Sequence, residues 1–501
     1  MADHLRRKVA VGVAWMTSAR ALVRLLGLLS TLVLARLLTP ADFGIVAMAM
    51  AVAAALELLT LYSFETALIQ QPDILRAHYD SAWTLNVLLG LCLAIALAAA
   101  AGPAAAFYRE PRLEAVMVLV GAKFLIDGTV NTGTIDFRRQ LVFGRDFVLQ
   151  VGPKIAGILI TIPLAYWLRD YRALLAGMLC NSVARCLLSY VMHPHRPRFC
   201  LTEARGLFRY SRWLLLNSVV GFLRVRSADF IIVRQLGAGT LGVFTVSYEV
   251  SNLPSTEMVA PINRVLFPSY VQLAHDTDGL RESFSSTLGL IALVILPASI
   301  GLAAVADPLV RVVLGNQWLQ TIPVISLLAL AGAANVLQTN TGSVYNALGR
   351  PRLSALTGAI HAVLLIPMLL YATHVFGLIG VAWAILIHSL ALGLPITYWI
   401  FFRNTPIRPV DVWRVCWRPV VACVVMFIAA NRCLVLLEPQ SELARSVLNL
   451  IAACFAGALA YVLTILILWQ ATGRPVGAES MLLQKLGSGW RRYSSNDQHT
   501  N

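Results

Sequence analysis

The sequence has few charged residues. Only 13% of its 501 residues are Asp, Glu, Lys or Arg, whereas 58% are hydrophobic. A soluble domain of this length could not keep so much apolar surface away from water, so the composition indicates an integral membrane protein. The 40 basic residues outnumber the 25 acidic ones, but they are scattered through short connections and form no stripe. A nucleic-acid partner is therefore excluded.

Cysteine pairs and catalytic motifs are also scarce. The eight cysteines include no CxxC pair and lie mostly in apolar runs, which supports neither a disulfide framework nor a zinc site. No GxxxxGK[ST], HExxH or GxSxG is present, and the GAGTLG at 237–242 joins two apolar runs without a βαβ pattern. We therefore predict no ATP-driven motor, no enzyme, no cofactor and no metal. His361 and His388 lie in apolar runs, where a packed histidine is commoner than a ligand.

Apolar runs of membrane-spanning length are present throughout the chain. They are bounded by Pro, Gly and charged residues, and there are fourteen of them. The runs cover residues 13–38, 43–65, 80–101, 114–134, 148–168, 171–192, 211–236, 241–262, 285–305, 320–340, 353–374, 377–402, 414–437 and 446–470. The expected fold is an all-α polytopic membrane protein with about fourteen transmembrane helices.

The distribution of basic residues predicts the orientation of these spans. With a cytoplasmic N-terminus, the N-terminal segment, the even-numbered connections and the C-terminal tail carry twenty-five Lys and Arg residues, Lys154 among them. The odd-numbered connections carry nine. Because cytoplasmic connections are enriched in Lys and Arg, both ends of the chain are predicted to be cytoplasmic.

The chain also resembles itself at an offset of 198 residues. Identical residues recur as Trp15, Leu25, Arg36, Leu38, Gly44 and Val52 in the first copy and as Trp213, Leu223, Arg234, Leu236, Gly242 and Val250 in the second. The copies begin at the first and seventh spans, which predicts two pseudo-symmetric six-helix lobes around a central cavity. The predicted organisation is a lobe over 1–200, a lobe over 201–403, two additional transmembrane helices over 404–472, and a cytoplasmic tail over 473–501.

Charged residues interrupt the first span of each predicted lobe. Arg20 and Arg24 share a helical stripe with Thr17, Gly27 and Thr31, and Arg224 lies on the corresponding stripe of the seventh span. A guanidinium group that faces lipid costs several kcal/mol, so these side chains should face protein or a water-filled cavity. The three arginines are our candidate clamp for a diphosphate group.

Other charged residues in the spans have neighbours with which they can pair. Lys123 and Asp127 are spaced for an ion pair on one helix, as are Arg226 and Asp229. Two alternatives remain open for the acidic residues Glu57 and Glu249. They can pair with the clamp arginines and lock the lobes together, or, with Asp127, they can act in ion coupling.

Four stretches of the chain resemble a known family. They are LARLLTPADFGIVAMA, FETALIQ, YSRWLLLNSVVGFLRVRSADFIIVRQLGAGTLGVFTVSYEV and INRVLFPSYVQL. The chain resembles the polysaccharide transporter family of the multidrug/oligosaccharidyl-lipid/polysaccharide (MOP) exporters, and within it the Wzx-type flippases of exopolysaccharide and lipopolysaccharide synthesis. The resemblance covers nearly the whole chain. Cationic residues line the cavity of that family, and Arg20, Arg24 and Arg224 match them by position.

The resemblance implies a function without covalent chemistry. It predicts a multi-pass protein of the bacterial inner membrane that moves an undecaprenyl-diphosphate-linked oligosaccharide to the periplasmic leaflet by alternating access. The implied partners are this lipid-linked glycan, membrane lipids, and polysaccharide polymerase and export machinery. The alternatives are a multidrug exporter of the same superfamily, a lipid-II-type flippase of cell-wall synthesis, and a membrane-embedded glycan polymerase or ligase. The glycan, the coupling ion and the oligomeric state do not follow from the sequence.

Overall fold

The computed structural model describes residues 2–57, 68, 75–140, 142–202, 221–222, 226–437, 443–474 and 479–480, and the account below is confined to them. Every regular element in these ranges is a helix. This confirms the prediction of an all-α fold.

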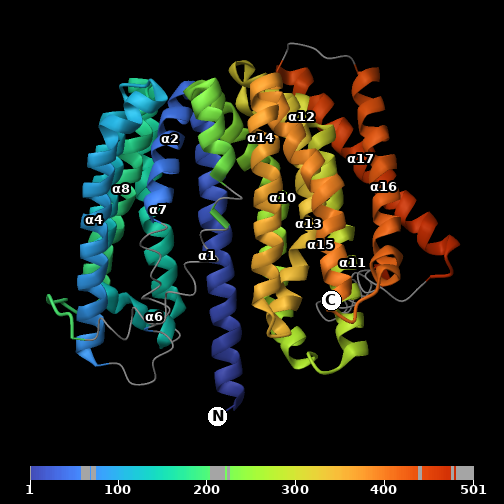
Figure 1. Cartoon of the computed structure of the whole chain (residues 1–501), viewed down its shortest axis with the longest axis horizontal. Coiled ribbons are helices and arrows are strands. Elements are labelled where there is room, and N and C mark those ends of the chain that lie inside the picture. Colours follow the sequence, from blue (N-terminus) through green and yellow to red (C-terminus); the bar gives the residue numbers. More distant parts are fainter. Residues whose placement is uncertain are drawn as a thin grey trace, which may run out of the picture. The chain divides into compact units, whose positions relative to one another are not determined.

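Many of the helices are long, and where the connection between two helices is described it is usually short (Figure 1). The first part of the chain forms α1 (Ala2–Leu37), α2 (Pro40–Glu57), α4 (Arg76–Tyr108), α5 (Leu113–Gly128), η2 (Thr132–Ile135), α6 (Asp136–Arg139), α7 (Phe143–Leu168), α8 (Arg172–Met192) and α10 (Ala238–Gln272). The remainder forms α11 (Thr277–Ala304), α12 (Ala306–Leu309), η3 (Val310–Leu314), η4 (Asn316–Trp318), α13 (Thr321–Ala347), α14 (Pro351–Ile387), η5 (His388–Gly393), α15 (Leu394–Asn404), α16 (Pro409–Leu436) and α17 (Leu443–Ala471).

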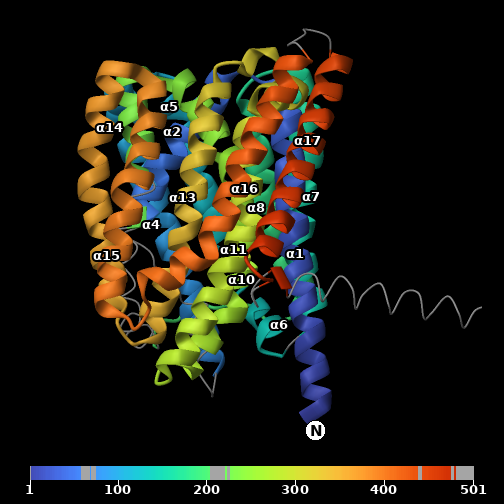
Figure 2. The ribbon, with the colours of Figure 1, turned by 90° about the vertical axis from the view of Figure 1, so that its right-hand side faces the viewer.

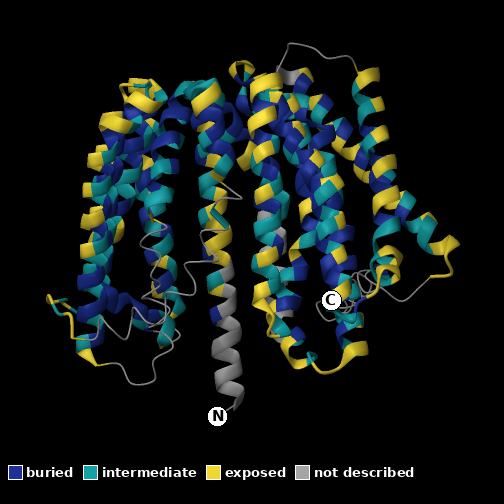
Figure 3. Cartoon of the chain, viewed as in Figure 1, coloured by how far each residue is buried: buried dark blue, intermediate teal, exposed yellow. Residues whose placement is uncertain are grey.

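Ten helical segments within the described ranges are long and apolar enough to cross a membrane. Their exposed side chains fit this environment. On α4, for example, Leu88, Leu91 and Ile95 are 44%, 42% and 60% exposed on one face of the helix (Figure 3). Large apolar side chains in contact with solvent along a whole helix are typical of a lipid-facing surface. The chain is therefore a multi-pass membrane protein, and the number of fourteen spans stays a prediction.

Two predicted spans differ from the helices observed. The span predicted over 114–134 ends at Gly128, because the Asn131 side chain accepts a hydrogen bond from the Gly133 amide over 2.9 Å and starts the separate helix η2. The spans predicted over 353–374 and 377–402 are helical with little interruption. Gly377, at φ 62°, breaks α14 between them, and η5 follows as a π-helix.

The chain divides into two compact units. The first contains residues 1–245 and 373–378, and the second contains residues 246–372 and 379–501. In the first unit α4 packs against α5, α7 against α8, and α1 against α7. In the second unit α11 packs against α13 and α16, and α16 packs against α17 (Figure 2).

Small residues allow the helices of the first unit to approach closely. The carbonyl oxygens of Phe124 and Asn86 lie only 2.6 Å from the positions that a Cβ would take on Gly90 and Gly128, respectively. Glycine at such positions lets two backbones approach closely. The resulting van der Waals contacts hold membrane helices together, because no hydrophobic effect drives one against another inside a bilayer. These contacts hold α4 against α5.

Two closer contacts between a glycine and a backbone carbonyl join α2 to α10. The residues involved occupy corresponding positions in the two copies of the internal repeat. A Cβ on Gly44 would overlap the carbonyl oxygen of Ala238, and a Cβ on Gly242 would overlap the carbonyl oxygen of Pro40. Gly44 and Gly242 are separated by the repeat offset of 198 residues, and so are Pro40 and Ala238. A reciprocal contact between equivalent positions is the signature of local two-fold symmetry. The start of α10, which belongs to the first unit, meets α2 in this way.

The second unit has a buried core of apolar side chains from several helices. One cluster joins α11, α13, α16 and α17, and includes Leu296, Ala333, Met426 and Tyr461. The Tyr461 hydroxyl donates a hydrogen bond of 2.7 Å to the carbonyl oxygen of Leu293, which satisfies a buried polar group within the apolar contact.

The glycine contact between α2 and α10 generates a stability prediction. Substitution Gly44→Ala or Gly242→Ala should lower the free energy of unfolding by about 1–3 kcal/mol, because the added methyl group meets a backbone carbonyl that cannot rotate away. The measurement is thermal unfolding of the purified protein in detergent. The matched control is Gly239→Ala on the same helix, where no heavy atom lies within 4 Å of the new methyl group. An unfolding temperature for Gly44→Ala equal to that of the control would contradict the prediction.

Candidate functional site

The predicted clamp residues of the first span lie on α1, which packs beside α7. The Trp15 and Phe147 rings meet with their centroids 5.0 Å apart. Further along both helices, Cε and Nζ of Lys154 lie 3.6 Å from the position of a Cβ on Gly27. The second contact lies later in both helices than the first. The helices α1 and α7 therefore run parallel to each other here.

Arg20 and Arg24 are exposed on α1. With Gly27 they are spaced by four and three residues, so they share one face of the helix. Lys154 packs over the Gly27 end of that face and is partly buried. The structure therefore adds a third cation to the predicted stripe. We call Arg20, Arg24 and Lys154 the cation stripe.

Lys154 was not predicted as a site residue, and its assignment to a cytoplasmic connection is wrong. It lies well inside α7, which begins at Phe143. Among the described residues, no carboxylate lies within 4 Å of its ammonium group. The sequence did contain a signal, because Pro153 and Lys154 interrupt an apolar run, and a lysine within a membrane span usually marks a functional site.

The third predicted clamp residue, Arg224, lies outside the described residues. Its neighbours Arg226 and Asp229 are described, and Nη1 of Arg226 lies 3.0 Å from Oδ2 of Asp229. The carboxylate of Asp229 is mostly buried and satisfied by this contact. Arg226 and Asp229 therefore form a local ion pair.

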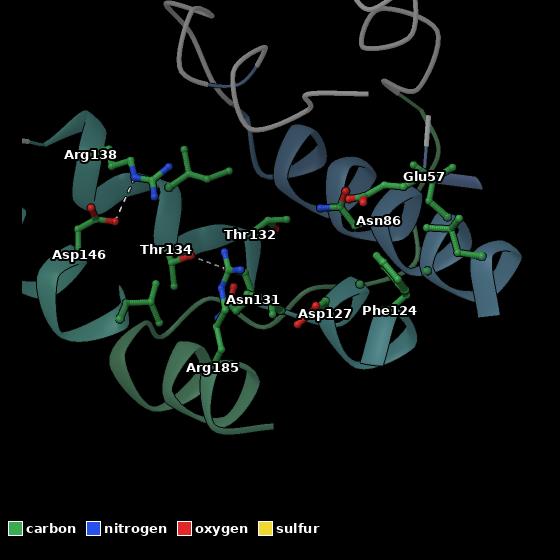
Figure 4. A pocket seen from close by; sticks show the side chains of 17 residues that line it. Glu57, Asn86, Phe124, Asp127, Asn131, Thr132, Thr134, Arg138, Asp146 and Arg185 are labelled. Atoms are coloured by element: carbon green, nitrogen blue, oxygen red, sulfur yellow. Dashed lines mark hydrogen bonds and ion pairs between the residues drawn. The ribbon is translucent and has the colours of Figure 1, made fainter. Parts of the chain in front are cut away.

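A polar cavity lies within the first unit (Figure 4). Its volume is about 300 Å³. Its polar and charged lining is supplied by Glu57, Asn86, Asp127, Asn131, Thr132, Thr134, Arg138, Asp146 and Arg185. These side chains come from α2, α4, α5, η2, α6, α7 and α8 and from the turn after α5. The cavity brings together Glu57 and Asp127, two of the three residues considered for ion coupling.

Ion pairs neutralise part of this lining. Nζ of Lys123 lies 2.8 Å from Oδ2 of Asp127, and Nε of Arg138 donates to Oδ1 of Asp146 over 3.0 Å. Asp146 is almost completely buried and also accepts a hydrogen bond of 2.6 Å from Gln150. A buried carboxylate needs such partners, since an isolated one would lose its hydration without compensation.

Arg185 also lines the cavity, and among the described residues it has no ion-pair partner. No carboxylate among the described residues lies within 4 Å of its guanidinium group, and the side chain is exposed. In Figure 4 it extends from α8 toward Asn131 and Thr134. Glu57 and Asn86 point toward one another on the opposite wall. The cavity thus offers an exposed cation facing amide and carboxylate groups.

The remaining predicted residue, Glu249, is exposed on α10 in the second unit. Glu57, Glu249 and Arg24 each make a polar contact within the chain. Among the described residues, no group of three or more His, Cys, Asp or Glu side chains could hold a metal ion. In chemical terms, the first unit presents cations that fit phosphate oxygens and a neighbouring cavity whose amides and carboxylates can form hydrogen bonds with hydroxyl groups.

Comparisons with known proteins agree with this picture. The chain is 25% identical over 403 residues to the lipopolysaccharide biosynthesis protein WzxC of Escherichia coli (strain K12), a match that covers 80% of this chain and 82% of that protein. It is 25% identical to the succinoglycan biosynthesis transport protein ExoT of Rhizobium meliloti (strain 1021), over 87% of this chain and 88% of that protein.

A solved structure and a family model extend the comparison. The lipid II flippase MurJ, in an inward closed conformation, superposes with a TM-score of 0.69 at 13% identity, over 91% of this chain and 99% of that chain. The fold is therefore that of MurJ. The family model described as polysaccharide biosynthesis protein matches residues 33–323. These matches confirm the resemblance to the polysaccharide transporters, and the chain belongs to the polysaccharide biosynthesis protein family.

Proposed function

We propose that this protein is a flippase that moves a polyprenyl-diphosphate-linked oligosaccharide across the bacterial inner membrane for exopolysaccharide or lipopolysaccharide synthesis. The family and the relatives named for lipopolysaccharide and succinoglycan synthesis support the substrate class. The fold shared with a lipid flippase supports the type of process. No bond is made or broken in the proposed cycle.

The observation that carries this proposal is the cation stripe. Arg20, Arg24 and Lys154 lie on one side of the α1 and α7 pair, within helices that are otherwise apolar enough to cross a membrane. Cations at such positions are costly unless water or an anion solvates them. A diphosphate carries the charge and the oxygen acceptors that guanidinium and ammonium groups bind most strongly.

The stripe suggests how a glycan can cross without entering hydrocarbon. The diphosphate binds the cations, and the hydroxyl groups of the first sugars bind polar side chains such as those of the cavity in the first unit. The polyprenyl chain stays in the lipid. Alternating exposure of this polar path to the two sides then moves the head group, because a sugar transferred directly into hydrocarbon would lose several hydrogen bonds to water.

The proposed architecture is fourteen transmembrane helices in two six-helix lobes, with two additional C-terminal helices and both termini in the cytoplasm. The lobes are proposed over 1–200 and 201–403, the extra helices over 404–472, and the cytoplasmic tail over 473–501. The reciprocal contact of Gly44 and Gly242 supports the internal symmetry. Arg224 belongs to the proposed clamp as the counterpart of the first-span arginines. Polysaccharide polymerase and export machinery are the proposed protein partners.

Deletion of the gene tests the function in the host. If the protein is a flippase, lipid-linked repeat units should accumulate on the cytoplasmic leaflet, and surface polysaccharide should be lost. The lipid-linked glycan is extracted and its amount is measured. Whether it lies in the cytoplasmic or the periplasmic leaflet is determined from its cleavage by a glycosidase added to the periplasmic side. Accumulation of complete repeat units on the periplasmic leaflet would instead favour a polymerase or ligase, and an unchanged glycan with increased drug sensitivity would favour a multidrug exporter.

Substitution of the cation stripe tests the binding site. Each of Arg20→Gln, Arg24→Gln and Lys154→Gln should reduce polysaccharide export in a complemented deletion strain by about 10- to 100-fold, because a charge-assisted contact to phosphate contributes about 1.5–3 kcal/mol. Lys154→Arg should retain most of the export. The control is Arg172→Gln, which removes an exposed cation beside Asp170. Protein levels are compared by immunoblotting, and normal export in all three Gln variants would reject the stripe as the binding site.

A further inference from the structure

A second cavity lies in the second unit, where α11, α13, α16 and α17 meet the short elements α12 and η3. Its volume is about 310 Å³, at the lower end of the roughly 300–1,000 Å³ of small-molecule sites. α12 packs against α13 and α17, and η3 packs against α17. The polar and charged residues of its lining are Asp307, Arg311, Ser326, Asn431, Ser446 and Asn449.

The cavity lies where four apolar helical segments end. These candidate membrane spans are Thr277–Ala304, Thr321–Ala347, Pro409–Leu436 and Arg445–Ala471. All residues of the lining lie within about two helical turns of Ala304, Thr321, Leu436 or Arg445. The ends of membrane spans lie at the depth of the phospholipid head groups. We call this cavity the boundary cavity.

The surface beside the boundary cavity is apolar and exposed. Val435 lines the cavity and is 72% exposed, and Leu436 next to it is 83% exposed. Large apolar side chains at the end of a membrane span contact lipid. Acyl chains can therefore lie along α16 while a polar group attached to them enters the cavity. The two connections that meet here, after α11 and after α16, are both predicted to be periplasmic.

One ion pair supplies charges of both signs to the boundary cavity. Nε of Arg311 lies 3.0 Å from Oδ1 and 3.2 Å from Oδ2 of Asp307. The two Nη groups of Arg311 make no hydrogen bond to the described residues. Both side chains are partly exposed. The pair therefore keeps guanidinium N–H donors and carboxylate lone pairs available to a ligand.

The segment that carries Arg311 is anchored by its neighbours. Arg311 lies on the π-helical turn η3, whose residues Val310 and Leu314 are 0% and 1% exposed. Trp318 is completely buried, and the Thr321 hydroxyl donates a hydrogen bond of 2.6 Å to its carbonyl oxygen. The backbone beside Arg311 is therefore fixed before a ligand binds, which lowers the entropic cost of binding.

Asn431 adds a neutral acceptor from α16. Its Nδ2 donates a hydrogen bond of 2.9 Å to the Phe427 carbonyl oxygen, which orients the amide. Its Oδ1 accepts no hydrogen bond from the described residues. The boundary cavity thus offers acceptors from Asp307 and Asn431 and donors from Arg311.

We propose that the boundary cavity binds the head group of a zwitterionic phospholipid with a primary ammonium group, as in phosphatidylethanolamine. The phosphate accepts hydrogen bonds from the Nη groups of Arg311, and the ammonium group donates to Asp307 and Asn431. A choline head group has no N–H to donate, and a glycerol head group has no positive charge to place beside Asp307. The bound lipid links η3 and α12 to α16. This proposal does not depend on the flippase function.

Native mass spectrometry tests the lipid preference. The full-length protein in detergent is titrated separately with phosphatidylethanolamine, phosphatidylglycerol and phosphatidylcholine that carry the same palmitoyl and oleoyl chains. One phosphatidylethanolamine should bind with a Kd at least about tenfold lower than that of either other lipid, because only its head group satisfies both charges of the ion pair. Equal affinities for the three lipids, or tighter binding of phosphatidylglycerol, would overturn the proposal.

Variants place the binding in the boundary cavity. Arg311→Gln should weaken phosphatidylethanolamine binding by about tenfold or more. Asp307→Asn should abolish the preference for phosphatidylethanolamine over phosphatidylglycerol, because the carboxylate is removed while Arg311 remains. The matched control is Arg432→Gln, which removes an exposed cation next to Asn431 that does not line the cavity. Wild-type binding in both Arg311→Gln and Asp307→Asn would overturn the site.

Asn431→Leu keeps the ion pair intact and should also weaken phosphatidylethanolamine binding. Thermal unfolding without added lipid establishes that each variant is folded. Added phosphatidylethanolamine should raise the unfolding temperature of the wild type and of Arg432→Gln, because a ligand of the native state stabilises it, and it should not do so for Arg311→Gln. Glycerophosphoethanolamine, which has the head group without acyl chains, should have no effect at the same concentration. An equal rise with this soluble head group would overturn a lipid as the occupant.

Discussion

A charged side chain within a bilayer must be solvated by protein, water or a ligand, and this constraint explains much of what the described helices contain. Where a charge serves the fold, it is paired at short range on the same or the next helix. Lys123 with Asp127, and Arg226 with Asp229, are pairs of this kind. Such pairs are neutral as units, so they can lie within an apolar helix at limited cost.

The cation stripe places several charges of one sign on one side of the α1 and α7 pair. Arg20 and Arg24 remain exposed on α1, and Lys154 has no carboxylate partner among the described residues. The stripe thus concentrates positive charge on one face of two parallel helices. In the proposed function, the diphosphate of the lipid carrier binds to these cations and supplies oxygen acceptors for their N–H groups.

Both units bury polar and charged groups between their helices. The first unit contains fixed charges around a cavity of about 300 Å³. The second unit contains a buried ion pair, in which Nη1 of Arg418 lies 3.0 Å from Oε1 of Glu479, and a chain of hydrogen-bonding groups from Gln338 to His388. Fixed cations are suited to recognise an anion such as a phosphate.

Much of the fold could be predicted because apolar runs and helical periodicity are local properties. Composition alone indicated a helical membrane protein, the spacing of Arg20 and Arg24 placed them on one helix face, and the 198-residue offset identified Gly44 and Gly242 as equivalent. The interruption after Gly128 was missed because it depends on the side chain of Asn131 rather than on hydropathy. The position of Lys154 beside the arginines of α1 was also missed, because the sequence does not show that α7 packs against α1.

The amino-acid sequence by itself therefore determined which segments are helical and apolar enough for a membrane, and which charges interrupt them, since both depend on residues close together in the chain. Only the tertiary structure decided that Lys154 joins the stripe of α1, that Glu57 and Asp127 line one cavity, and that His361 meets His388. These contacts join different helices, and their geometry depends on how small residues and hydrogen bonds set the packing of one helix against another.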